Sequence, residues 1–84
     1  MPTHAEIVEI LNREVYAAEA RLKETRRIVD AMITDWPGMA PQPEGNHRIT
    51  TAIKEHVASR EALELALKRN VDFTVNGIVP EDLK

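Results

Sequence analysis

Residues 4–35 have the sequence HAEIVEILNREVYAAEARLKETRRIVDAMITD, which contains neither glycine nor proline. Apolar side chains recur along it at alternating steps of three and four residues, which is typical of a helix that packs along one seam. Thr3 and Glu6 predict a capping box at its start, and Pro37 disfavours helical backbone at the residue before it. We therefore predict one long helix over residues 4–35, with the seam positions Val8, Leu11, Val15, Ala18, Leu22, Thr25, Val29, Met32 and Trp36.

A second long helix is predicted over residues 47–75, with Asn46 as its N-cap. Its expected apolar face consists of Ile49, Ile53, Val57, Leu63, Leu67 and Val71, with Ala52 and Ala66 at the edge. Residues 71–75 also alternate in polarity like a strand, and the Asn-Gly pair that follows is a hairpin signal. We favour a helix that continues to Val75 and ends at a left-handed Gly77, because Val75 extends the apolar face.

The connection between the helices, residues 36–46, contains three prolines and two glycines. It is longer than the roughly two to eight residues that usually join antiparallel helices. One interpretation is that Trp36 plugs the open end of a helix bundle. The other is that Trp36, Pro37 and Met39 form a stiff loop that binds a protein partner. A short C-terminal tail, residues 76–84, follows the second helix.

Together these elements predict an all-α fold in which two long antiparallel helices form a hairpin within a single domain, residues 1–84. One hairpin has a single helix–helix interface and no closed core. Ile7 and Ile28 lie beside the seam on one side and Ile33 lies on the other, so the apolar surface of the first helix is wider than one neighbour can cover. We therefore predict that two hairpins pair into a dimeric four-helix bundle.

A polar layer is predicted inside this bundle. His56 and Arg60 project from the centre of the second helix's apolar face, and Thr25 interrupts the seam of the first. In a closed hairpin, residue i of the first helix lies opposite roughly residue 82 − i of the second, which places Thr25 near His56. These three residues would form a pH-sensitive site or a layer that fixes helix register. Alternatively, the Arg60 stem would cover the seam while its charged end stays in water.

The composition argues against several classes of function. The chain has no cysteine, and 11 Lys and Arg residues against 14 Asp and Glu residues give a net charge of −3, which does not favour nucleic-acid binding. The basic cluster is interleaved with acidic residues and comprises Arg21, Lys23, Arg26 and Arg27. No metal-ligating spacing, glycine-rich phosphate loop or nucleophile–base pair occurs. We expect no enzymatic activity, no cofactor and no metal.

The chain contains no apolar run near the ~20 residues of a membrane span, and its first residues lack the pattern of a signal peptide. We therefore expect a cytoplasmic protein without membrane contact. From its residues, the expected function is that of a small interaction or accessory protein acting as a homodimer. A small regulator that binds a protein or nucleic-acid target is an alternative.

A further alternative comes from Trp36-Pro37-Gly38, which resembles the Trp-x-Gly turn of the small helical-hairpin proteins exported by ESX-type secretion systems. The resemblance extends to chain length, hairpin topology and the position of the turn, and it implies an exported effector. Two features depart from that family. The connection is long and rich in proline, and the C-terminal Tyr-x-x-x-Asp/Glu export signal is missing, because the single tyrosine is Tyr16.

Overall fold

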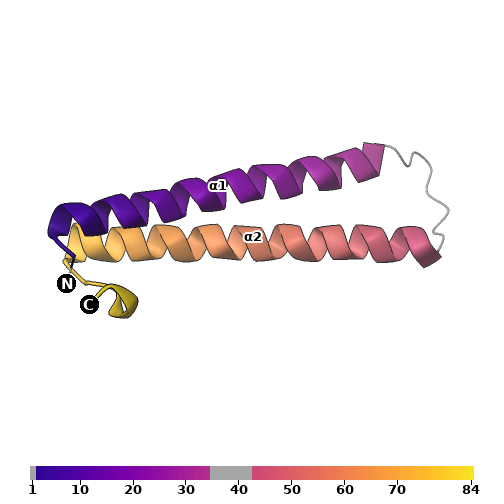
Figure 1. Ribbon diagram of the computed structural model, residues 1–84. Helices are drawn as coiled ribbons and strands as arrows, with labels where there is room; N and C mark the ends of the chain where they lie inside the picture. The colour runs from indigo at the N-terminus through magenta and orange to yellow at the C-terminus, as the bar shows by residue number, and fades with distance from the viewer. Residues whose placement is uncertain (1, 35–42) are drawn as a thin grey trace.

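The computed structural model describes residues 2–34 and 43–84, apart from the side chains of residues 43–46. It consists mainly of two long helices, α1 (His4–Thr34) and α2 (Pro43–Asn76). The helices run antiparallel and pack side by side, so both ends of the chain lie together (Figure 1). A short 3-10 helix, η1 (Glu81–Leu83), follows α2. The predicted all-α helical hairpin is confirmed.

The hairpin is a thin rod, with extents of 55 × 18 × 17 Å and a radius of gyration of 17.6 Å. A compact domain of this length would have a radius of gyration of about 12 Å. Two helices share only one interface, so apolar side chains that do not face this interface remain in contact with water. The shape of the molecule therefore leaves much of its apolar surface uncovered.

At the end of the rod where the termini lie, both helices carry the caps that the sequence predicts. The Glu6 amide donates to Thr3 Oγ1 at 3.2 Å, and the Thr3 amide donates to Glu6 Oε1 at 3.3 Å. This is the reciprocal pair of a capping box. Gly77 has a φ of 69°, and its amide donates to the Phe73 carbonyl at 3.0 Å. Residues 71–75 are therefore helical, as favoured, and the strand alternative is wrong.

The start of the second helix was predicted too late in the chain. α2 begins at Pro43 and not after an Asn46 cap. Proline suits the first turn of a helix, where its missing amide proton has no partner to lose. Residues 43–46, which were predicted to belong to the connection 36–46, are therefore part of α2. The candidate partner-binding residues of this connection lie outside the described part of the chain: Trp36, Pro37 and Met39.

The seam predicted for the first helix faces α2. Leu11, Ala18 and Thr25 are buried at intervals of seven residues. The other described members of the seam are half-buried, namely Val8, Val15, Leu22, Val29 and Met32. Ile7, expected beside the seam, is buried as well, whereas Ile33 is exposed. The apolar period of α1 thus matches the line of contact with its neighbour.

The apolar face predicted for the second helix is correct only in part, because Ile49, Val57 and Leu63 are half-buried whereas the other large members are exposed. Among the described side chains of α2, the buried ones are Ala52, Ser59, Ala66 and Phe73, again seven apart. By contrast, Ile53 and Leu67 are each 44% exposed, and Val71 is 49% exposed. Ala52 and Ala66 each precede one of these large residues by one position, so the contact face is rotated by about 100° from the predicted one. The fully buried residues of α2 that face α1 are thus small apart from Phe73, and the exposed residues Ile53, Leu67 and Val71 mark a second face.

The apolar core is concentrated where the chain ends meet. Its buried members are Ile7, Leu11 and Phe73, with Val8, Val79 and Leu83 packed against them. The His4 and Phe73 rings lie with their centroids 4.8 Å apart. The chain that follows Gly77 thus folds back and closes this end of the hairpin with two apolar side chains.

Leu11 and Leu65 provide a matched test of this packing. Leu11 is fully buried, whereas Leu65 is 60% exposed. We expect Leu11→Ala to lower the free energy of unfolding by about 2–5 kcal/mol, because it leaves a cavity in the core. Leu65→Ala should change it by no more than about 0.5 kcal/mol. Urea unfolding followed by circular dichroism, at one protein concentration, measures both, and equal losses would contradict the observed helix faces.

Candidate functional site

Midway along the hairpin, three polar side chains meet between the helices, and we call Thr25, His56 and Ser59 the hydroxyl–imidazole cluster. The Thr25 hydroxyl oxygen of α1 lies 3.1 Å from Nδ1 of His56 and 2.7 Å from the hydroxyl oxygen of Ser59, both on α2. Thr25 and Ser59 are buried, and His56 is half-buried. The cluster joins the two helices at a defined point along their length.

The cluster satisfies its own hydrogen bonds. The Thr25 hydroxyl lies 3.1 Å from the Leu22 carbonyl, and Ser59 donates to the His56 carbonyl at 2.8 Å. A hydroxyl has one proton and two lone pairs, so Thr25 donates its proton either to the Leu22 carbonyl or to a neighbour in the cluster, and it can accept only from His56 or Ser59. Either tautomer of His56 therefore finds a partner at Nδ1. Among the described side chains, no buried nitrogen or oxygen lacks a hydrogen bond.

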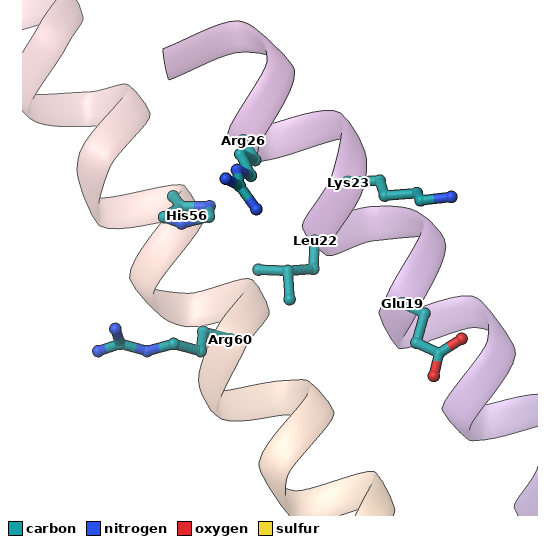
Figure 2. A pocket seen from close by; sticks show the side chains of 6 residues that line it. All are labelled: Glu19, Leu22, Lys23, Arg26, His56 and Arg60. Atoms are coloured by element: carbon teal, nitrogen blue, oxygen red, sulfur yellow. The ribbon is translucent and has the colours of Figure 1, made fainter. Parts of the chain in front are cut away.

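Of the three residues predicted for the polar layer, the structure brings Thr25 and His56 together and leaves Arg60 outside. Arg60 is exposed, and its guanidinium extends away from α1 (Figure 2). Ser59 takes the buried place, because the contact face of α2 lies one residue away from the predicted face. The signal that would have identified Ser59 is its spacing of seven residues from Ala52 and from Ala66.

An open groove lies beside the cluster, on the side of the hairpin that we call the groove flank. Its volume is about 430 Å³, and its lining consists of Glu19, Leu22, Lys23, Arg26, His56 and Arg60. Leu22 points across the groove towards α2, whereas Lys23 and Glu19 extend away from it (Figure 2). The charged groups thus stand at the rim, in water, and do not converge on one point.

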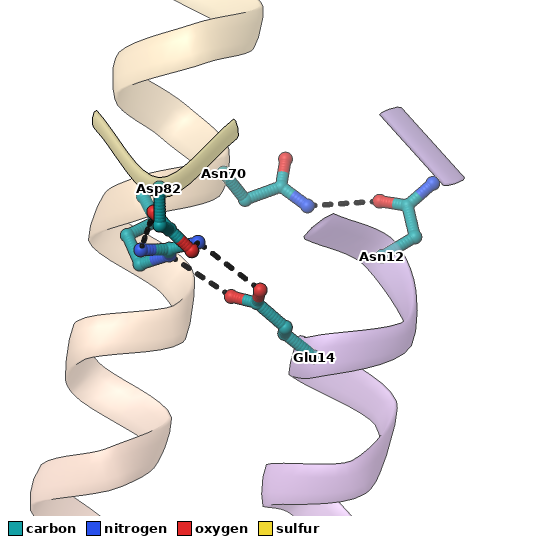
Figure 3. A network of polar contacts seen from close by, with 5 residues as sticks. Asn12, Glu14, Asn70 and Asp82 are labelled. Carbon is teal, nitrogen blue, oxygen red and sulfur yellow. Dashed lines mark hydrogen bonds and ion pairs between the residues drawn. The ribbon is translucent and has the colours of Figure 1, made fainter. Parts of the chain in front are cut away.

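On the opposite flank, Arg69 of α2 connects three parts of the chain. Its guanidinium donates to both carboxylate oxygens of Glu14 on α1, at 3.0 and 3.1 Å. It also donates to both carboxylate oxygens of Asp82 in η1, at 2.8 and 3.0 Å. Beside it, the Asn70 side-chain amide donates to Asn12 Oδ1 at 2.8 Å (Figure 3). The planar donor fork of arginine suits two carboxylates at once.

The Arg69 contacts hold the C-terminal segment against the hairpin. Hydrogen bonding to Arg69 lowers the pKa of the Asp82 carboxyl, although partial desolvation acts in the opposite sense. The same hydrogen bond to Asp82 is the main cause that raises the pKa of Arg69. Arg69 was not among the predicted site residues. The register of roughly i to 82 − i places Glu14 next to Arg69, and their opposite charges are the signal that would have found this pair.

A row of large aliphatic side chains runs along α2 on the groove flank. We call this row the aliphatic stripe; its members are Ile53, Val57, Leu67 and Val71, interrupted at the centre by Arg60 and Glu64. Successive members are three or four residues apart and therefore share one face of the helix. Val75, four residues after Val71 and 74% exposed, continues the stripe towards the C-terminus. Arg60 also lines the groove, which places the stripe on that flank.

The three histidines lie far apart along the described hairpin. His4 stacks near Phe73 at the terminal end, His56 belongs to the central cluster, and His47 lines a cavity near the start of α2. Within the residues whose side chains are described, no three His, Asp or Glu groups are placed to bind a metal ion. Neither described long helix has an apolar stretch sufficient to cross a membrane.

The hydroxyl contact between the helices can be tested with a double-mutant cycle. Thr25→Val keeps the shape of the side chain and removes a buried hydrogen-bonding group, so it should lower the free energy of unfolding by about 1–2 kcal/mol. Thr25→Val combined with Ser59→Ala should cost less than the sum of the two changes, because the residues share one contact.

The control for this cycle is Thr74→Val. Thr74 is exposed, and its hydroxyl donates only within the helix, to the Asn70 carbonyl at 2.8 Å. The free energy of unfolding of this variant should stay within about 0.5 kcal/mol of the parent. Denaturant unfolding measures each variant, and strict additivity of Thr25→Val and Ser59→Ala would contradict a shared contact.

The Arg69–Asp82 contact predicts a pH dependence. A carboxyl whose pKa is lowered on folding contributes stability above its unfolded pKa and loses that contribution as pH falls through the lowered value. The C-terminal segment should therefore stay attached at neutral pH and detach only below the usual range of an aspartate. Arg69→Gln should raise the Asp82 pKa towards its ordinary value of about 4. Carbon NMR of the side-chain carboxyls follows both titrations.

Glu24 is the internal control in the same titration. Its pKa is lowered mainly by a hydrogen bond from Arg27, on α1 and remote from Arg69. Arg69→Gln should leave the Glu24 titration unchanged. An Asp82 titration that is also unchanged in this variant would show that Arg69 does not hold the C-terminal segment.

No family model, curated protein or solved structure matches this chain. The described hairpin has three distinctive features: the hydroxyl–imidazole cluster between the helices, the Arg69 contacts on one flank, and the aliphatic stripe on the other.

Proposed function

We propose that this protein is a non-enzymatic helical interaction module that acts as a homodimer. The observation that supports the proposal is the aliphatic stripe on α2. Four large aliphatic side chains lie on one face of one helix, and Ile53, Leu67 and Val71 remain close to half exposed although the hairpin is closed. Large exposed aliphatic side chains that share one helix face often mark an interface.

The thin core of the hairpin also supports association. The buried apolar residues include three alanines, namely Ala18, Ala52 and Ala66, and the larger buried side chains are confined to the terminal end. Small domains with little buried apolar area commonly gain stability from a partner chain. A second copy laid along the groove flank would cover the stripe and close a four-helix bundle.

The charges of the hairpin are consistent with a role in protein contacts. Within the basic cluster of α1, Arg27 pairs with Glu24 at 2.7 Å, and Arg26 lies 3.9 Å from Asp30. These pairs neutralise part of the cluster that a nucleic acid would need, and the net charge of −3 opposes a polyanion. The proposal therefore places function in the apolar face and not in a basic surface.

Light scattering tests the homodimer. We expect a mass near two chains at tens of micromolar, and a melting temperature that rises with protein concentration, because association stabilises only the folded chains. Val71→Glu should reduce the mass to that of one chain, since it places a charge in the stripe. Leu65→Glu, an exposed leucine on the other flank, is the matched control and should remain dimeric. A parent protein with the mass of one chain would refute the proposal.

A further inference from the structure

The centre of the aliphatic stripe carries two opposite charges, Arg60 and Glu64. Along α2 the stripe positions follow one another at steps of four, three, four, three and four residues. This spacing is the same in both directions. Two copies of α2 laid antiparallel therefore bring matching positions together in three kinds of pair: Ile53 with Val71, Val57 with Leu67, and Arg60 with Glu64.

We propose that two copies of this chain pair through α2 in this antiparallel register, with a two-fold axis between Arg60 and Glu64. The inference rests on the homodimer proposed above and specifies its geometry. Each aliphatic position of the stripe then faces an aliphatic position of the second copy. The two-fold axis repeats every contact, so one interface contains two Arg60–Glu64 ion pairs.

The central charges select the direction of pairing. Arg60 and Glu64 are exposed, and neither forms an ion pair among the described side chains of the hairpin. In a parallel alignment Arg60 would face Arg60 and Glu64 would face Glu64, and like charges opposite each other repel. The antiparallel alignment turns both of these repulsions into attractions.

The same charges select the register. Sliding one helix until Arg60 meets the second Arg60 restores a like-charge contact at the centre. Sliding it further places Arg60 opposite Val57, and sliding it in the other direction brings Glu64 to Glu64 and then Arg60 opposite Val71, which buries a charge without a partner. The register centred between Arg60 and Glu64 pairs both charges and keeps aliphatic residues opposite aliphatic residues.

The arrangement of the C-terminal segment leaves this face accessible. Arg69, which holds η1, is two residues from both Leu67 and Val71, so it lies about 160–200° around the helix from the stripe. Asp82 lines a cavity on that other flank together with Ala62 and Leu65. The chain thus covers one flank of the hairpin with its own end and leaves the stripe open to a second copy.

Charge reversal tests the central pair. Arg60→Glu places two acidic groups opposite each other at both central contacts, and it should raise the dimer dissociation constant about tenfold or more. Arg60→Glu combined with Glu64→Arg restores the opposite charges and should return the dissociation constant to near the parent value. The control is Arg21→Glu, which makes the same change of charge on α1, four residues from Ala17 on the opposite flank. Analytical ultracentrifugation measures all four proteins.

Cysteine cross-linking tests the direction and register independently, because the chain has no cysteine of its own. A mixture of Val57→Cys and Leu67→Cys chains, carrying tags of different size, should oxidise to the mixed dimer. Val57→Cys alone should cross-link poorly, since its two copies would lie roughly 15 Å apart along the helix axis. A parallel pairing would give the reverse result, with each variant linking to itself.

The outcomes separate this inference from the homodimer on which it rests. A parent chain that sediments as a monomer overturns both. A dimeric parent whose reversed double variant fails to recover, or whose Val57→Cys chains link to themselves, overturns the antiparallel register and leaves the homodimer standing. Recovery of the double variant together with the mixed disulfide supports the register.

Discussion

The close contact between α1 and the small side chains of α2 is the constraint on which the rest of the structure depends. Ala52, Ser59 and Ala66 stand at every seventh position, and this line decides which face of α2 meets its neighbour. Because small residues occupy the contact, the bulky residues beside them turn outward. The exposed stripe and the buried hydroxyl of Ser59 both follow from this one choice of face.

The contact between α1 and α2 buries little apolar surface, so polar contacts between the helices define how they align. Alanines pack closely but remove little surface from water, so they fix the alignment of the two helices weakly. The hydroxyl–imidazole cluster supplies a directional contact at mid-length, and the Arg69 contacts supply a second near the terminal end. Hydrogen bonds of this kind define register because a shift along the helix would leave buried polar groups without partners.

The sequence predicts the hairpin itself well, because helix signals are local. The capping box at Thr3, the long period of α1 and the glycine that ends α2 each follow from a few neighbouring residues. The register of the two helices, and with it the meeting of Thr25 with His56, also follows from simple chain geometry. The start of α2 was misjudged because Pro43 suits either a loop or a first helical turn.

The face of α2 could not be predicted in the same way. Hydrophobic patterning identifies the most apolar side of a helix, and in α2 that side is directed away from α1. Several of the largest residues of α2, Ile53, Leu67 and Val71, stay exposed, whereas the small residues Ala52, Ser59 and Ala66 are buried against α1. The path of the C-terminal segment was missed for another reason: the contact of Asp82 with Arg69 depends on a fold-back that no helical period encodes.

The location of the apolar cluster has a consequence for how the chain folds. Ile7, Leu11 and Phe73 come from nearly opposite ends of the sequence, whereas nearer the turn between the helices the fully buried residues are alanines and hydroxyl residues, and the aliphatic residues Leu22, Val29 and Met32 are only half-buried. Closing the hairpin from that turn outward would therefore bury apolar surface only partly until the terminal end also closes. The contacts that release the most water are also those with the largest loop-closure entropy to overcome. This favours cooperative, all-or-none formation of the hairpin, with a folding rate limited by a high contact order for a helical protein.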